Sequence, residues 1–171
     1  SYSTNYDADF YTYMIQTSEV PALVIQPNTL NVGIGTANPT NKLQVAGHVQ
    51  CTSVIQTSDR NAKENIEPAS PDEILAGVSA LPIATWNFKN DNSGPHLGPM
   101  AQDFRTAFGL GNTDSGICSV DADGVALAAI QGLNRKLDAA LQAKDAQISA
   151  LQSRVEQLEK TLNESKRPQS Q

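Results

Sequence analysis

The sequence has few of the residues on which several large classes of protein depend. Among its 171 residues only 5% are aromatic, two are cysteine and two are histidine. No run of about 18 apolar residues occurs, so no membrane-spanning helix is predicted. Cys51 and Cys118 lack the spacing of a metal site and cannot build a disulfide-dense scaffold, although a single disulfide stays open. We therefore expect neither a bound metal nor a cofactor.

Apolar and basic residues are also in short supply. A hydrophobic content of 39% is thin for one globular core of this length, which favours an elongated or oligomeric protein. Residues 1–122 carry 5 Lys and Arg against 12 Asp and Glu, and residues 123–171 carry 7 against 6. Neither part has the basic excess that binding to nucleic acid or to an anionic membrane requires, so we expect neither partner.

The aromatic residues gather at the start of the chain. Five of the nine lie within the first 13 positions: Tyr2, Tyr6, Phe10, Tyr11 and Tyr13. They can form a sugar-binding cluster, or a stub whose rings pack against an upstream fibre segment or against the same rings in partner chains. Because the chain begins at Ser1 without a methionine or a signal peptide, we expect it to be a fragment of a longer protein.

Short apolar runs separated by turn residues follow, up to about residue 55. Strands are predicted over 22–26, 30–35 and 43–45. Strands this short do not make a stable sheet alone, whereas three copies wound together supply enough of them. Gly33 and Gly35 suit a narrow stalk in which backbones approach closely. A phosphate loop at the same place would need a lysine and a following helix, and both are missing.

A serine and a lysine lie five residues apart in the motif SDRNAKENI, residues 58–66. A hydroxyl beside an amine can act as a nucleophile and base pair. Five residues on an α-helix is about 500°, so Ser58 and Lys63 meet only if the backbone between them turns, which Asp59, Arg60 and Asn61 allow. A free lysine has a pKa of about 10.4, and burial lowers it. The alternative is that Thr57 or Ser58 simply caps a short helical turn.

The next fifty residues carry clear boundary signals. Ser70 begins a capping box followed by proline, and predicts a helix from residue 71 that ends before Pro82. A strand over 83–88, a turn-rich loop over 90–95 and a strand edge leading into a second helix over 96–109 come next. The apolar residues of this second helix recur every four positions and are expected in the core: Met100, Phe104 and Phe108.

A heptad repeat occupies the last part of the chain and predicts a parallel coiled coil. Positions a are Leu127, Asn134, Leu141, Ile148, Val155 and Leu162. Positions d are Ile130, Leu137, Lys144, Leu151 and Leu158. Arg154 at g can pair with Glu159 at e of a neighbouring chain, which favours parallel helices. Asp121 or Asp123 is the expected cap.

The motif SDRNAKENI is preceded by LNVGIGTANPTNKLQVAG at 30–47. It is followed by a Trp-Asn-Phe strand, by HLGPMAQDF at 96–104 and by the heptad helix. Together these motifs resemble the endosialidase-type C-terminal intramolecular chaperone. That family caps phage tail spikes and fibres. The resemblance implies a homotrimeric domain that helps an upstream fibre assemble and then cuts itself off. It implies that Ser58 is the nucleophile, that Lys63 is its base and that the bond cut is Thr57–Ser58. A histidine base, His48, is the alternative to the lysine.

We therefore expect an α+β fold with a trimeric β-stalk end at 1–57, a chaperone and peptidase domain at 58–120, a coiled-coil helix at 121–166 and a disordered tail at 167–171. On the usual rules for coiled coils, heptads with Asn134 at an a position favour two helices, while the family implies three. We follow the family, because the stalk needs a third chain to close.

The predicted protein is a single-turnover serine endopeptidase. Its partners are further copies of itself and the upstream fibre or spike segment, on a virion tail fibre or spike or on a prophage-derived or bacterial surface fibre. The chaperone part leaves after cleavage. Two alternatives remain: a trimer clamp of the same fold that does not cut, and a receptor-binding fibre tip.

Overall fold

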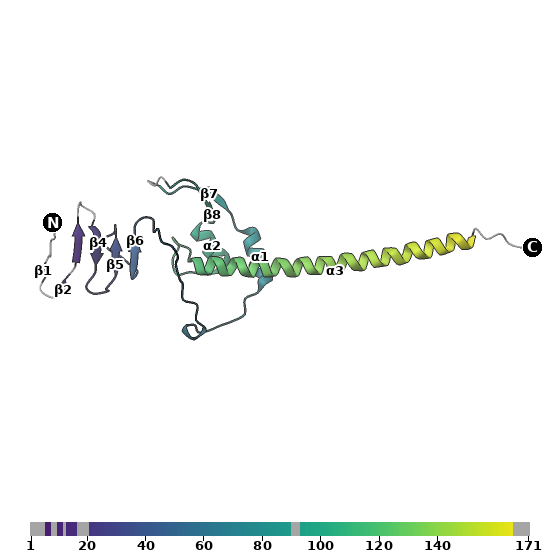
Figure 1. The fold of residues 1–171 in the computed structure, drawn as a ribbon, viewed down its shortest axis with the longest axis horizontal. Helices are drawn as coiled ribbons and strands as arrows, with labels where there is room; N and C mark the ends of the chain where they lie inside the picture. The colour runs from purple at the N-terminus through teal and green to yellow at the C-terminus, as the bar shows by residue number, and fades with distance from the viewer. Residues whose placement is uncertain (1–5, 8–9, 12, 17–20, 90–92, 166–171) are drawn as a thin grey trace, which may run out of the picture. The chain divides into compact units, whose positions relative to one another are not determined.

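A computed structural model describes residues 6–7, 10–11, 13–16, 21–89 and 93–165. The fold is mixed α+β, with small sheets and one long C-terminal helix (Figure 1). The chain divides into two compact units, residues 1–57 and 58–171, which we describe separately. Within the described ranges, no helix is long and apolar enough to cross a membrane.

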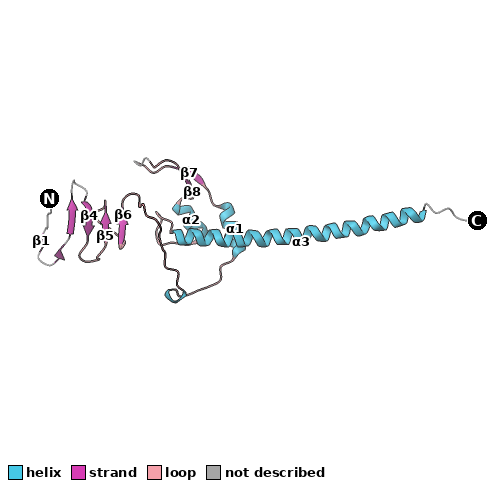
Figure 2. Cartoon of the chain, in the orientation of Figure 1, coloured by secondary structure: helices cyan, strands magenta, loops and turns pink. Residues whose placement is uncertain are grey.

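The first unit consists of short strands, drawn in magenta in Figure 2. Strands β1 (Tyr6–Asp7) and β2 (Phe10–Tyr11) form an antiparallel pair. Strands β3 (Tyr13–Gln16), β4 (Pro21–Ile25), β5 (Val32–Ile34) and β6 (Leu43–Val45) form a second sheet in that order. The first two contacts of this sheet are antiparallel and the β5–β6 contact is parallel. The predicted strands are therefore present, and one chain pairs four strands in a single sheet. The trimeric stalk stays a prediction.

The second sheet is closed by tight packing within one chain. Val24 on β4, one of its two inner strands, is only 2% exposed, and the buried Asn31 side chain donates to the Pro39 carbonyl at 3.0 Å. A Cβ atom added at Gly33 would lie 2.5 Å from the Thr36 carbonyl oxygen. Gly35 has a φ of 68°, which favours glycine. Close backbone approach is therefore present within one chain, from the following turn at Gly33 and from Ala46 at Gly35.

A helix and two strands follow the exposed segment of residues 58–70 in the second unit. Helix α1 (Pro71–Ala80) starts at the predicted cap, where Ser70 Oγ accepts from the Glu73 amide at 3.5 Å and proline takes the first helical position. Strands β7 (Ala84–Trp86) and β8 (His96–Gly98) pair antiparallel, and β8 ends before Pro99, which could not donate to the ladder.

Helix α2 (Ala101–Phe108) follows and ends on Gly109 with a φ of 66°. Phe104 is buried and its ring lies 5.0 Å from that of Phe108, as expected of core residues. Met100, which was expected in the core, is 40% exposed, because it occupies the cap position before the helix begins.

Helix α3 (Ser119–Ser165) runs through the rest of the described chain. It begins earlier than predicted: Asp121 lies in its first turn, and the amides of residues 121 and 122 donate to the Cys118 carbonyl. The expectation that Asp121 or Asp123 caps this helix was wrong. The expected helix end and tail, from Lys166 onward, lie outside the described residues.

Helix α1 lies against the first part of α3 (Figure 1). The buried residues of α3 are Val125, Ala129 and Gly132, which recur at helical spacing on one face. A Cβ added at Gly132 would overlap the Pro71 carbonyl oxygen and lie 2.9 Å from its carbon. Gly132 therefore allows the backbones of α1 and α3 to touch.

Replacing Gly132 with alanine is expected to destabilise the second unit by about 1 to 3 kcal/mol, since the new methyl group meets backbone that has no rotamer to change. Gly124→Ala is the matched control on the same helix, where a Cβ meets nothing within 4 Å. We expect this control to be stabilised by up to about 1 kcal/mol through helix propensity. Urea unfolding of both variants measures the difference, and equal effects of the two substitutions would contradict the packing described.

Candidate functional site

The motif at residues 58–63 folds into a single tight turn. Residues Arg60–Ala62 form a short 3-10 helix, η1, with Asp59 as its N-cap. The Asp59 carboxylate accepts from the Asn61 amide at 2.9 Å and from the Asn61 side chain at 3.2 Å, and the Lys63 amide donates to the Arg60 carbonyl at 3.2 Å. The alternative that Thr57 or Ser58 caps this turn is wrong, because Asp59 does so.

This turn brings the two residues of the predicted dyad together. The amine of Lys63 donates to the hydroxyl oxygen of Ser58 across 2.8 Å. On a regular α-helix the two side chains would point about 140° apart, so their contact depends on the 3-10 turn and on the extended backbone of Lys63 after it. The hydroxyl and the amine are thus within the distance that direct proton transfer requires.

The two carboxylates nearest to Lys63 in the sequence, Asp59 and Glu64, do not pair with its amine. Asp59 is held by its two bonds to Asn61 and does not pair with the lysine. In the described part of the chain, the ion pair seen is Arg105–Asp114 at 2.7 Å, so Glu64 does not pair with Lys63 either. Among the described residues, therefore, neither carboxylate forms an ion pair with the Lys63 amine.

Ser58 and Lys63 lie in a long stretch that is open to solvent. Every residue from 46 to 70 is exposed. The apolar side chains in it share this exposure, with Ile55 at 94% and Ile66 at 59%. Large apolar side chains are thus exposed on both sides of the motif in the sequence.

The backbone amides near Ser58 limit where a carbonyl oxygen could be stabilised. The amides of Asn61, Ala62 and Lys63 already donate within the turn. Those of Asp59 and Arg60 donate to no group among the described residues. Within the described part of the turn, the Asp59 and Arg60 amides are therefore the ones left without an acceptor.

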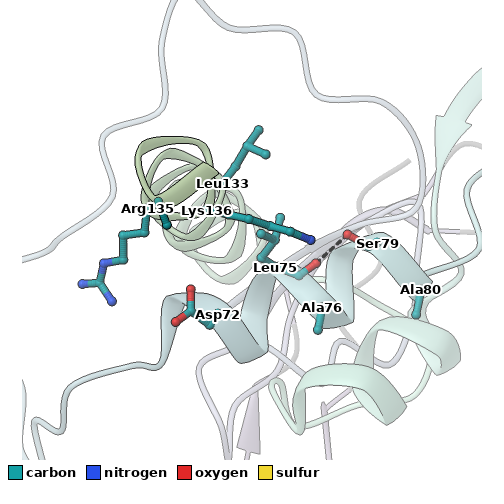
Figure 3. A pocket seen from close by; sticks show the side chains of 9 residues that line it. Asp72, Leu75, Ala76, Ser79, Ala80, Leu133, Arg135 and Lys136 are labelled. Atoms are coloured by element: carbon teal, nitrogen blue, oxygen red, sulfur yellow. Dashed lines mark hydrogen bonds between the residues drawn. The ribbon is translucent and has the colours of Figure 1, made fainter. Parts of the chain in front are cut away.

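A groove of about 790 Å³ lies between α1 and α3 (Figure 3). It is lined mainly by small and aliphatic residues, with Asp72 on one helix and Arg135 and Lys136 on the other. Neither Ser58 nor Lys63 lines it. Ser79 and Lys136 also line it, but the Ser79 hydroxyl donates to the Leu75 carbonyl at 2.8 Å, so we do not assign the chemistry to this groove.

The heptad positions of α3 form an uncovered apolar stripe. Its apolar a and d residues from Leu127 to Leu162 are each between 51% and 65% exposed. The residues that α1 covers, Val125, Ala129 and Gly132, fall at heptad positions f and c, on the opposite side of the helix. The stripe is also hollowed between Ile148, Leu151 and Val155. Side chains of a neighbouring helix can enter such a hollow while α1 stays in place.

Two features of the second unit were not predicted from the sequence. The capping role of Asp59 could have been inferred, since an aspartate two residues before an asparagine is typical of a local side-chain turn. The contact of α1 with α3 at Gly132 could not, because a glycine within a heptad pattern carries no sign of which helix approaches it. The predicted roles of the aromatic residues at the start of the chain stay predictions: Tyr2 lies outside the described residues, and no side-chain surroundings are described before residue 22.

Residues 58–109 match the model of the family Peptidase_S74, described as the chaperone of endosialidase. The match begins at Ser58 and includes the 58–63 turn, α1, β7, β8 and α2. The resemblance inferred from the sequence is thus confirmed for this segment. No curated protein matches the chain as a relative.

Proposed function

We propose that this chain, with a chaperone segment of endosialidase type at residues 58–109, drives homotrimerisation of an upstream fibre or spike and then releases itself by cutting the Thr57–Ser58 bond. The observation that carries the proposal is the 2.8 Å contact between the Lys63 amine and the Ser58 hydroxyl. The division of the chain into two compact units at the same bond supports it, since a cut there would separate units that each have their own contacts.

The reaction begins at the hydroxyl of Ser58. Its oxygen attacks the carbonyl carbon of Thr57, and its proton passes to the neutral Lys63 amine. The bond from carbon to the Ser58 nitrogen then breaks, the lysine returns the proton to that nitrogen, and an ester between Thr57 and the Ser58 oxygen remains. Water hydrolyses the ester, which leaves a carboxylate on Thr57 and a free amino group on Ser58.

For the Lys63 amine to take the proton of Ser58, the direction of the hydrogen bond between them must reverse. In the single chain the Lys63 amine donates to the hydroxyl, whereas a base has to accept from it, and a charged ammonium has no acceptor. Removing water from an amine favours its neutral form. Because Lys63 is exposed in one chain, we propose that neighbouring chains cover it on assembly and so make cleavage wait for the trimer.

The uncovered stripe of α3 is the surface through which the trimer forms in this proposal. Its apolar residues gain burial only against other helices, at about 25 cal/mol for each Å² removed from water. Arg154 at g and Glu159 at e are placed to pair across parallel neighbours. Helix α1 packs on the far face of α3 and does not compete for the stripe.

Refolding the chain from denaturant over a range of concentrations tests this coupling. We expect cleavage to follow trimer formation: at low concentration the chain stays intact and monomeric, and at high concentration two fragments appear as sedimentation reports a trimer. Cleavage at the same rate in a monomer would contradict the coupling. A stable trimer that never cuts would favour the permanent clamp.

Replacing Asp59 with alanine is expected to slow cleavage by about 10-fold to 100-fold, because the turn that places the lysine loses its cap. Asp59→Asn keeps an acceptor for the Asn61 amide and should restore most of the rate. Glu64→Ala is the control, since this exposed carboxylate makes no described contact, and it should cut at the normal rate. Single-turnover gels measure the rates, and loss of cutting in the asparagine variant would show that the carboxylate has another role.

A further inference from the structure

Helix α3 carries a lysine where its apolar stripe would otherwise be continuous. Lys144 occupies a d position between Leu141 and Ile148, which are 53% and 51% exposed in one chain. Assembly through this stripe, which rests on the function proposed above, takes these positions out of water. A buried ammonium is costly unless it is paired.

The neighbours of Lys144 on its own helix supply no acid on its side of the stripe. At 100° per residue, position d lies next to position g. From the second heptad onward, the g residues of α3 are Leu133, Ala140, Gln147, Arg154 and Thr161. None of them is acidic, and Gln147 offers only a neutral oxygen, so a carboxylate for the amine has to come from another chain.

The e positions present the needed carboxylates. Across a parallel pair of helices, the g side of one faces the e side of the other. At e stand Asp145, beside Lys144 in the sequence, and Asp138, one heptad earlier. Asp138 already accepts from the Asn134 side chain within its own helix at 3.1 Å, while no bond of Asp145 is seen in the described chain. Asp145 is therefore the free carboxylate.

Orientation follows from the same geometry. In an antiparallel pair the g side faces another g side, which holds no acid, so Lys144 would be buried without a carboxylate in any register. We infer that Lys144 of each chain is bound by Asp145 of a neighbouring copy, and that this charged layer makes parallel association the favoured one. Asn134, ten residues earlier at an a position, adds a polar layer that matches itself only in register.

A double-substitution series in the full chain, made uncleavable by Ser58→Ala, tests the pairing. Asp145→Asn and Lys144→Gln should each weaken the trimer, with the dissociation constant raised about tenfold or more. The exchange of both residues, Lys144→Asp with Asp145→Lys, should recover most of the loss, because the pair is restored with its charges reversed. Lys160→Gln, at position f on the outer side of α3, is the matched control and should leave assembly unchanged.

Sedimentation equilibrium gives the association, and far-UV circular dichroism shows whether each variant keeps its helix. If the exchanged variant loses as much affinity as the two single variants together while α3 stays helical, the pairing of Lys144 with Asp145 is wrong. The proposal of a trimer would not be affected by that result. A parent chain that stays monomeric at every concentration would instead contradict the proposed function itself. A label at the C-terminal end of α3 reports orientation: short distances between labels are expected, and long distances would overturn the inference.

Discussion

Lys63→Ala is expected to abolish cutting at the Thr57–Ser58 bond while the protein still forms its trimer. The amine is the one described partner of the Ser58 hydroxyl, at 2.8 Å, and its removal leaves the nucleophile without a base. Loss of a positioned base costs about 10²-fold to 10⁴-fold in rate. Because the side chain is exposed in a single chain, its loss should leave the fold of the chain unchanged.

Two further substitutions separate the roles of the dyad. Lys63→Arg should fail as completely as alanine, since a guanidinium keeps the charge but does not give up its proton. Ser58→Ala should also leave an intact chain. Lys89→Ala, an exposed lysine outside the motif, is the control and should cut normally. Cutting of Lys63→Ala at the normal rate would mean that the lysine is no base, and the histidine alternative at His48 would then be tested by substitution.

A charge placed in the stripe of α3 is expected to have the second large effect. Leu141→Asp combined with Ile148→Asp should convert the trimer to monomer at micromolar concentration, because three carboxylates would meet in each of two layers. In one chain these positions are half exposed, so the substitutions disturb no core. Cleavage should be lost together with the trimer, and sedimentation with a denaturing gel measures both.

Ser153→Asp provides the control for these charges. It stands at position f on the outer side of the same helix and is exposed. Its trimer and its cleavage should match those of the parent chain. Should the doubly charged variant stay trimeric, the stripe would not be the surface of assembly.

Much of the second unit could be predicted from the sequence, because its signals are local. Ser70 followed by proline fixed where α1 begins, and the four-residue spacing of Phe104 and Phe108 indicated the buried face of α2. Lys63 was predicted to meet Ser58 only if the chain turned between them, and the local side-chain contacts of Asp59 explain why it does.

The remaining features depend on contacts that are distant in the sequence. The pairing of β5 with β6 is parallel and crosses an eight-residue loop, so no hairpin signal reports it. The packing of α1 against Gly132 brings together Pro71 and Gly132, which are some sixty positions apart in the sequence. Both place backbone against backbone, which leaves little trace in the pattern of apolar residues.

The most direct measurement is the mass and N-terminal sequence of the fragments that form when the assembled chain is left in native buffer. We predict two products, residues 1–57 and residues 58–171, with the larger one beginning at Ser58 and carrying a free amino group. An intact chain after full assembly, or a cut at any other bond, would contradict the account.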